Sequence, residues 1–253
     1  MRTIDINSDL GEFSDAAHLD SDRKVLQFVT SANIACGFHA SDPLTMTKSV
    51  RMAKEAGAAV GAHPGFPDRE NFGRRAMDLS PEEVRAIVLY QVGALDAVCR
   101  AEGAALTHVK PHGALYNMAA KDEKLALAIA DAIASYDKEL IFVGLSGSLM
   151  EEASRQKDLR FAAEVFADRA YEDDGTLVSR GKPGAMIEDE TLAVRRMVRL
   201  IREGVIESVN GKDIPLQADT VCVHGDSPKA VAFASKLREA LEADGIAVRN
   251  MIK

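Results

Sequence analysis

The chain has 253 residues, of which 47% are hydrophobic and 28% charged, enough for one sizeable core. Its net charge of −8, with no long basic stretch, argues against nucleic acid as a partner. The first residues lack an apolar signal core, and no apolar run approaches the roughly 20 residues of a membrane helix. Three cysteines without a CxxC pair argue against a disulfide framework or a cysteine zinc site. We therefore expect a soluble, cytoplasmic protein.

Seven short apolar runs predict buried parallel strands, and helical segments separate them. The predicted strands are Thr3–Ile6, Ala32–Ala35, Ala58–Ala62, Leu106–Val109, Leu140–Leu145, Phe161–Phe166 and Thr220–Val223. This alternation favours an α/β fold, a TIM-like β/α barrel distorted to seven strands, over two Rossmann-type halves. No Gly/Ser-rich or Pro-rich linker interrupts it, so residues 1–253 are expected to form a single domain.

Three helix starts are readable from their capping residues. Ser80 precedes Pro81, and Glu83 completes a capping box, so a helix is predicted to begin there and to end near Gly103. Asp42-Pro43 and Ser227-Pro228 predict two further starts. The longest irregular stretch, Asp168–Ile187, is interpreted as an excursion that covers a site.

Polar residues follow nearly every predicted strand, where the loops of a β/α barrel build the active site. Four of the six histidines stand directly after a predicted strand. A set that converges on one rim favours an enzyme over isolated structural histidines. The candidate residues are Asn7, Asp9, Glu12, His39, His63, Arg74, Arg75, Lys110, His112, Glu164, Asp168, Arg169, Tyr171, Arg180, His224 and Asp226.

Lys110 ends an apolar strand, and burying an ammonium group without a partner is costly, so a partner carboxylate or a substrate anion is predicted. Because the first and last strands of a closed barrel are neighbours, Asp9 and Asp226 are expected to lie close together. Arg74, Arg75 and Arg180 are either surface charges or clamps for a carboxylate or phosphate.

Three patterns carry less than they first suggest. Cys36 beside His39 could be a nucleophile, but a small buried residue at a strand end is the favoured interpretation. His108 and His112 have helical ligand spacing, yet they lie in an extended segment and cannot share one metal ion. The segment Gly175–Lys182 departs from the phosphate-loop pattern, so no nucleotide-binding motif is recognised.

Six segments in order carry a resemblance that covers nearly the whole chain. They are NSDLGE (7–12), NIACGFHASDP (33–43), GAHPGFPD with FGRR (61–75), VKPHGALYN (109–117), FADRAYEDDG (166–175) and VHGDSP (223–228). The sequence resembles the LamB/YcsF family, whose members are subunits of bacterial 5-oxoprolinase. The resemblance implies opening of the lactam ring of 5-oxo-L-proline to L-glutamate, with ATP and Mg²⁺ and with partner subunits B and C. It also implies a barrel similar to the glycoside hydrolase/deacetylase folds.

That reaction suggests roles for the candidate residues. Phosphorylation of the lactam carbonyl oxygen would make its carbon a better electrophile, and water must then attack. We assign water activation to Asp9 with His63 or His224, and stabilisation of developing charge to Lys110 and His112. Arg74 or Arg75 is assigned to the substrate carboxylate. The remaining polar residues are expected to bind substrate: Asn7, Glu12, His39, Glu164, Asp168, Arg169, Tyr171, Arg180 and Asp226.

Two alternatives stay open. A divalent metal held by Asp9, His39 and His63 would suit zinc or manganese, and a stand-alone metal-dependent deacetylase or amidohydrolase would use the same rim. An aromatic content of 5% without Trp supplies a sugar-stacking surface poorly, which disfavours the deacetylase. The second alternative is a non-catalytic subunit that only binds substrate within a complex.

Overall fold

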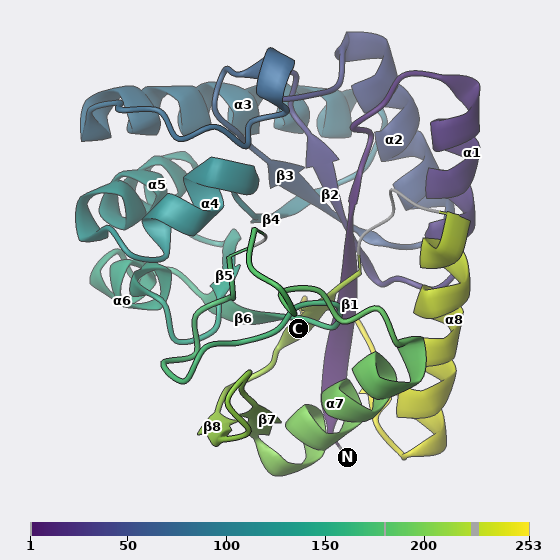
Figure 1. The fold of residues 1–253 in the computed structure, drawn as a ribbon. Coiled ribbons are helices and arrows are strands. Elements are labelled where there is room, and N and C mark those ends of the chain that lie inside the picture. The colour runs from purple at the N-terminus through teal and green to yellow at the C-terminus, as the bar shows by residue number, and fades with distance from the viewer. Residues whose placement is uncertain (1, 180, 224–227, 253) are drawn as a thin grey trace.

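The computed structural model describes residues 2–179, 181–223 and 228–252, and its central feature is a closed barrel of parallel strands (Figure 1). Around the barrel, the strands are β1 (Thr3–Leu10), β2 (Ser31–Ala35), β3 (Ala59–His63), β4 (Leu106–Val109), β5 (Ile141–Leu145), β6 (Phe161–Phe166) and β9 (Thr220–Cys222). β9 closes the sheet because Val221 pairs with Val165 on one side and Ile6 on the other. The predicted seven-stranded, TIM-like barrel is confirmed.

The first strand is longer than predicted. It continues past Ile6 to Leu10, which pairs with Ile34 of β2. Since successive strand residues point to opposite faces, Asp5, Asn7 and Asp9 share one face, the one turned into the barrel. The polar run was interpreted as the start of a loop because barrel interiors are ordinarily apolar. Asn7 and Asp9 are therefore strand residues.

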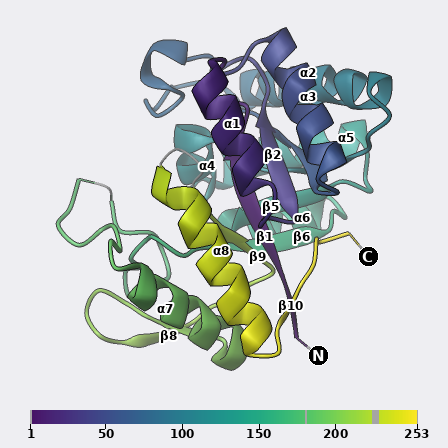
Figure 2. The same cartoon turned by 90° about the vertical axis from the view of Figure 1, so that its right-hand side faces the viewer.

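Helices surround the barrel on its outer side (Figures 1 and 2). The helices are α1 (Ala16–Val25), α2 (Pro43–Glu55), α3 (Pro81–Ala101), α4 (Gly113–Ala119), α5 (Glu123–Tyr136), α6 (Leu149–Gln156), α7 (Glu190–Glu203) and α8 (Pro228–Ala243), with a short 3₁₀ turn at Arg69–Asn71. α3 packs against α5 and α2, while α8 packs between α1 and α7. The apolar core lies between helices and sheet, where side chains such as Ile6, Ile34, Val88, Leu95 and Ile129 are fully buried.

The predicted capping signals act as expected in the described residues. The Ser80 backbone N–H donates to Glu83 Oε2 at 2.7 Å, and Ser80 Oγ accepts from the Glu83 backbone N–H. The Asp42 side chain caps α2 by accepting from two backbone N–H groups of its first turn. Gly103, with φ +67°, follows the C-cap of α3 in the left-handed conformation that glycine adopts without strain. Ser227 lies outside the described residues.

Three strands were not predicted because two or three residues are too short to show a periodicity. β7 (Val205–Glu207) and β8 (Asp213–Pro215) form an antiparallel hairpin after α7. β10 (Ala247–Val248) pairs with the beginning of β1, where Ala247 stands opposite Thr3. This pairing extends the sheet beyond the barrel without entering it.

The segment between β6 and α7 contains no helix or named strand among its described residues, as predicted for Asp168–Ile187. Two isolated bridges, Arg169 with Met186 and Tyr171 with Leu177, fold it back on itself. In Figure 1 it runs in front of the barrel. This position lets it supply part of a cavity wall.

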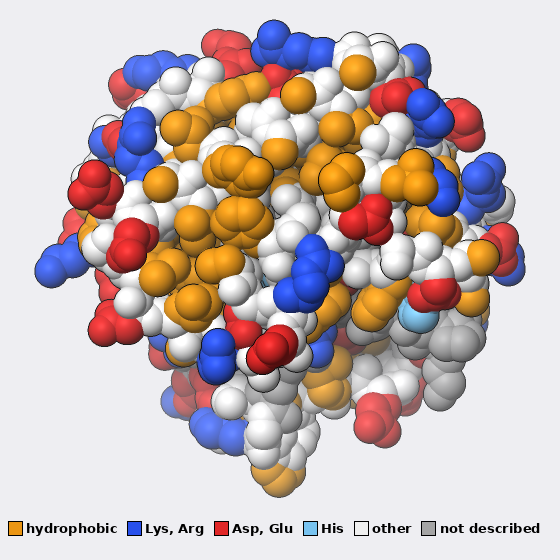
Figure 3. Space-filling model, turned by 90° about the horizontal axis from the view of Figure 1, so that it is seen from above, with side chains coloured by type: hydrophobic (Ala, Val, Ile, Leu, Met, Phe, Trp, Pro, Cys, Tyr) orange, Lys and Arg blue, Asp and Glu red, His pale blue; other side chains and the backbone are white. Residues whose placement is uncertain are grey.

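The outer face that carries α3 is partly apolar. Figure 3 shows hydrophobic side chains gathered on one side of this face, with charged side chains concentrated around its edge. Tyr90 of α3 is 65% exposed and lies 5.4 Å, between ring centroids, from Phe38. Among the described helices, none has the length and apolar character needed to cross a membrane.

Candidate functional site

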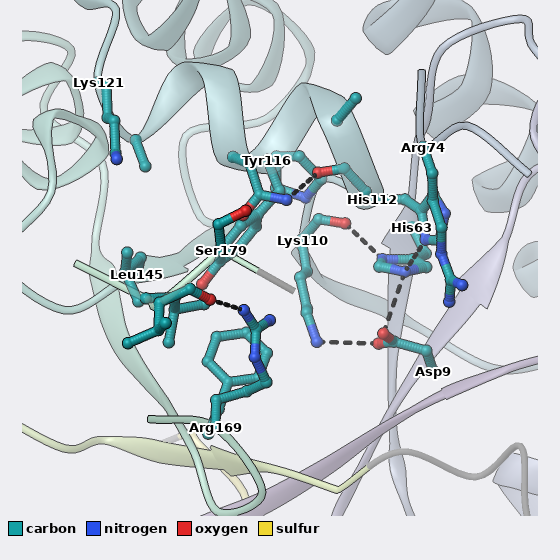
Figure 4. A pocket seen from close by; sticks show the side chains of 18 of the residues that line it. Asp9, His63, Arg74, Lys110, His112, Tyr116, Lys121, Leu145, Arg169 and Ser179 are labelled. Atoms are coloured by element: carbon teal, nitrogen blue, oxygen red, sulfur yellow. Dashed lines mark hydrogen bonds and ion pairs between the residues drawn. The ribbon is translucent and has the colours of Figure 1, made fainter. Parts of the chain in front are cut away.

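A cavity of about 420 Å³ opens at the carboxyl ends of the strands (Figure 4). Its walls come from the ends of β1, β3 and β4, from α4 and from the segment after β6. Of the predicted site residues, it is lined by Asp9, Glu12, His63, Arg74, Lys110, His112 and Arg169. Side chains from distant parts of the sequence thus share one space, as expected of a β/α barrel.

Lys110, directly after β4, lies on the cavity floor and is 3% exposed. Its Nζ is 2.7 Å from Glu164 Oε1, 2.9 Å from Asp9 Oδ1 and 3.2 Å from Asn7 Oδ1. Burial by itself would lower the pKa of Lys110, but Asp9, Cys222 and Glu164 outweigh it and hold that pKa well above its ordinary value. The ammonium is therefore charged, and the predicted partner carboxylate is present.

A network of amides inside the barrel positions Asp9. Asn33 Nδ2 donates to Asp9 Oδ1 and to Asn7 Oδ1, both at 2.8 Å. Asn7 Nδ2 donates to Thr220 Oγ1 at 2.7 Å, and His108 Nε2 lies 2.8 Å from Asn33 Oδ1. Neighbouring strands thereby hold the carboxylate of Asp9, whose Oδ2 lies 3.3 Å from His63 Nε2.

Beside Asp9, three histidines and one carboxylate form a compact group that we call the histidine cluster: Glu12, His39, His63 and His112. One ligand atom of each lies within 4.8 Å of the others. The three imidazoles are at least nine-tenths buried, and the rings of His39 and His112 stack with their centroids 3.8 Å apart.

Burial and the other imidazoles keep two members of this cluster uncharged. Burial lowers the pKa of His112 to about 3, with further lowering from His63 and His39. Burial also lowers the pKa of His39 well below its ordinary value, as does His63. Neutral imidazoles present lone pairs, so the cluster is suited to accept a proton or a metal ion.

Two predicted arginines differ in position. Arg74 lines the cavity, and its guanidinium lies 5.0 Å from the centroid of the Phe72 ring. Arg75 lies outside the lining, 63% exposed, with its Nη2 at 3.3 Å from Asp68 Oδ1. Arg169 reaches the cavity from the opposite wall, where it donates to the Val178 carbonyl at 2.6 Å.

Several predicted substrate contacts lie below or beside the cavity instead of on its surface. Asn7 and Glu164 are fully buried beneath Lys110. Tyr171 is fully buried, and its hydroxyl accepts from the Phe166 backbone N–H at 2.8 Å, so it packs in the core. Asp168 and His39 are also absent from the lining. The predictions for Arg180, His224 and Asp226 fall outside the described residues, and so does the expected approach of Asp226 to Asp9.

Two sequence patterns are resolved by geometry. Cys36 is buried, and burial raises the pKa of its thiol to about 12, which disfavours the nucleophile interpretation. His108 is hydrogen-bonded to Asn33 inside the barrel, while His112 belongs to the histidine cluster. They do not share a metal position, as predicted.

The sequence analysis did not single out Asn33, Tyr116, Lys121 or Ser179. Asn33 interrupts an apolar strand run, which was a usable signal of a buried polar contact. Tyr116 lines the cavity within the quoted segment VKPHGALYN, and burial together with Glu164 raises the pKa of its hydroxyl well above the ordinary value. Lys121 and Ser179 reach the cavity from a helix end and from the irregular segment, with no local pattern to mark them.

Comparison with known proteins decides the family. The model of the LamB/YcsF family matches residues 4–253. The chain belongs to the LamB/YcsF family. Curated relatives that are named as the A subunit of 5-oxoprolinase, from Clostridium beijerinckii and Thermococcus onnurineus, are 53% and 55% identical over 248 residues, 98% of this chain and 97% of each relative.

Solved structures agree with the fold. The crystal structure of a lactam utilization protein from Thermus thermophilus has a TM-score of 0.92 and 48% identity, covering 98% of this chain and 99% of that one. A T48 deacetylase with substrate has a TM-score of 0.50 at 12% identity, over 99% of this chain and 88% of that one. The second likeness concerns the fold alone, and the predicted resemblance to deacetylase folds is confirmed.

Proposed function

We propose that this LamB/YcsF chain is the A subunit of an ATP-dependent 5-oxoprolinase. With partner subunits B and C it hydrolyses 5-oxo-L-proline to L-glutamate while ATP becomes ADP and phosphate. The names of the relatives support this role. The structural observation that carries it is the charged Lys110, fixed between Asp9 and Glu164 on the floor of a cavity large enough for a small lactam.

The proposed reaction overcomes the poor reactivity of the lactam carbonyl. Transfer of the γ-phosphoryl group of ATP to the carbonyl oxygen releases ADP and makes the ring carbon electrophilic. Water adds to that carbon, the C–N bond breaks, and the ring nitrogen takes a proton to become the amine. A second water releases phosphate from the resulting acyl phosphate and leaves the side-chain carboxylate of glutamate.

Asp9 is placed to activate the attacking water. Its Oδ1 is fixed by Asn33 and Lys110, while its Oδ2 lies beside His63 at the cavity. A carboxylate held in this way accepts a proton from water without reorganising, and His63 can relay it. The same step was assigned to His63 or His224, and the role of His224 stays a prediction.

Cationic side chains around the cavity match the anionic groups of the reaction. Lys110 faces the oxygen on which charge develops, together with His112. Arg74, at the cavity wall, is suited to bind the substrate carboxylate. Lys121 and Arg169 also line the cavity and are placed to bind phosphoryl oxygens. ATP, as its Mg²⁺ complex, is the proposed phosphoryl donor.

The test is glutamate release from 5-oxoproline in an extract of host cells that lack this chain and contain its partners. Addition of the purified chain should restore release, and only when ATP is present. Asp9→Asn keeps the size of the side chain and should lower turnover at least about a hundredfold, with an unchanged melting temperature. The exposed Asp78→Asn is the matched control and should behave like the wild type. No restoration by the wild type would overturn the proposal.

The histidine cluster favours one second candidate, a metal-dependent amidohydrolase that acts alone. This enzyme would release glutamate, or hydrolyse another cyclic or N-acyl amide, from the purified chain without ATP. A chain that only binds substrate would instead restore release with Asp9→Asn as well as with the wild type. The same set of reactions therefore separates the three functions.

A further inference from the structure

The hydrogen bonds of His63 and His112 determine which of their ring nitrogens carry hydrogen. His63 Nδ1 lies 2.7 Å from the Lys110 carbonyl oxygen, and His112 Nε2 lies 2.8 Å from the Phe72 carbonyl oxygen. A carbonyl oxygen only accepts, so both of these nitrogens donate. In a neutral imidazole the other nitrogen then carries a lone pair.

The two remaining nitrogens face each other. His63 Nε2 and His112 Nδ1 are 3.0 Å apart, inside a part of the protein from which both side chains are largely withdrawn from water. Two lone pairs at this distance repel each other unless a positive charge lies between them. The geometry therefore calls for a cation.

The carboxylate of Glu12 completes the arrangement around the same point. Its Oε1 is 3.3 Å from His112 Nδ1, 3.4 Å from His39 Nε2 and 3.9 Å from His63 Nε2. Four ligands at about 2.0–2.1 Å around a tetrahedral zinc ion lie about 3.3–3.4 Å from one another. The observed separations bracket this value without any movement of the backbone.

His39 supplies an independent observation. It is 1% exposed, and among the described residues neither of its ring nitrogens makes a hydrogen bond. A buried imidazole without a partner is costly, and coordination of a metal through Nε2 would satisfy it. Two glycines hold the ring in place: a Cβ on Gly65 would lie 2.6 Å from His39 Nδ1, and one on Gly73 would lie 2.7 Å from His39 Cβ.

We propose that Glu12, His39, His63 and His112 form a binding site for a divalent transition-metal ion of the zinc class. The set differs from the one predicted from sequence, because Asp9 is bound by Asn33 and Lys110 while Glu12 and His112 face the centre of the cluster. A metal bound there supplies a Lewis acid beside Asp9. The site does not depend on the 5-oxoprolinase proposal, since binding is measured without substrate, ATP or partners.

The experiment uses the purified full chain after treatment with a chelator. Isothermal titration with Zn²⁺ alone should give one equivalent bound per chain, and Co²⁺ should give the intense visible bands of a tetrahedral site. His39→Gln and His112→Gln should each weaken Zn²⁺ binding at least about tenfold. His18→Gln, a change at an exposed histidine paired with Asp15, is the matched control and should bind like the wild type.

Folding of the variants is checked by melting without metal. Zn²⁺ should raise the melting temperature of the wild type and of His18→Gln, but not that of His112→Gln. If the wild type binds no Zn²⁺, and nitrogen NMR shows His63 or His112 doubly protonated, a shared proton occupies the gap and the proposal is wrong. Equal binding by the His39 and His112 variants would overturn it too.

Discussion

Lys110 Nζ and Glu164 Oε1 lie 2.7 Å apart, and neither side chain is more than 3% exposed. Glu164 belongs to β6, while Lys110 follows β4, so the ion pair spans the barrel interior beneath the cavity. Two charges withdrawn from water are stable only while they face each other. The pair therefore ties the position of the Lys110 ammonium to the integrity of the barrel.

Lys110→Met should lower the free energy of unfolding by about 3–5 kcal/mol, because it leaves the Glu164 carboxylate buried without its cation. Urea unfolding followed by circular dichroism measures the change. Adding Glu164→Gln to Lys110→Met removes the stranded charge and should recover part of the loss. A loss below about 1 kcal/mol in the single variant would mean that water reaches Glu164.

Asp5 predicts a pH dependence of stability. Burial raises its pKa to about 6, although hydrogen bonds from Ser31, Thr220 and Thr30 oppose the shift. Between its ordinary value of 3.8 and about 6, the folded chain holds a proton that the unfolded chain has lost. The contribution of Asp5 to the free energy of unfolding therefore falls as pH rises through this window, by about 3 kcal/mol in total.

Asp5→Asn tests this expectation in urea unfolding at pH 4 and pH 7. The stability of the variant relative to the wild type should rise by about 3 kcal/mol from the lower to the higher pH, since the amide does not ionise. Asp78→Asn, at an exposed position, should show no comparable change. A relative stability that is the same at both pH values would contradict the raised pKa of Asp5.

Gly61 and Gly93 offer a matched pair of substitutions. A Cβ on Gly61 of β3 would lie 2.1 Å from His108 Nε2, so Gly61→Ala must displace the ring that binds Asn33. A loss of about 1–3 kcal/mol or more is expected. Gly93 lies in α3, where the nearest atom would be 3.9 Å away, and Gly93→Ala should stabilise by about 0.4–1 kcal/mol. Thermal melting of both variants gives the comparison, and equal melting temperatures would refute it.

Arg74 and Arg75 are neighbours in sequence with different surroundings. If Arg74 binds the substrate carboxylate, Arg74→Met should raise KM for 5-oxoproline about 10- to 100-fold, with a smaller effect on kcat. Arg75→Met, at a position outside the cavity lining, should leave both constants within about twofold. Steady-state kinetics in the reconstituted system measures both, and the reverse ranking would reassign the carboxylate to Arg75.

The sequence by itself determined the order of strands and helices, because strand-length apolar runs and capping residues are local properties. Ser80 and Asp42 cap their helices as their spacing predicts. The cost of burying an ammonium group was enough to predict a partner for Lys110. The family was also evident from the sequence, since its motifs stand in order along the chain.

Only the tertiary structure decided which of the polar residues meet. Asn33 and Asp9 are joined because β1 continues alongside β2, in a register that no local pattern reveals. Glu12 and the three histidines follow four successive strands, and closure of the barrel turns sequence separations of up to 100 residues into contacts of 3–4 Å. Periodicity records which face a side chain takes. Distances between elements depend on strand pairing and helix packing, which the whole chain determines together.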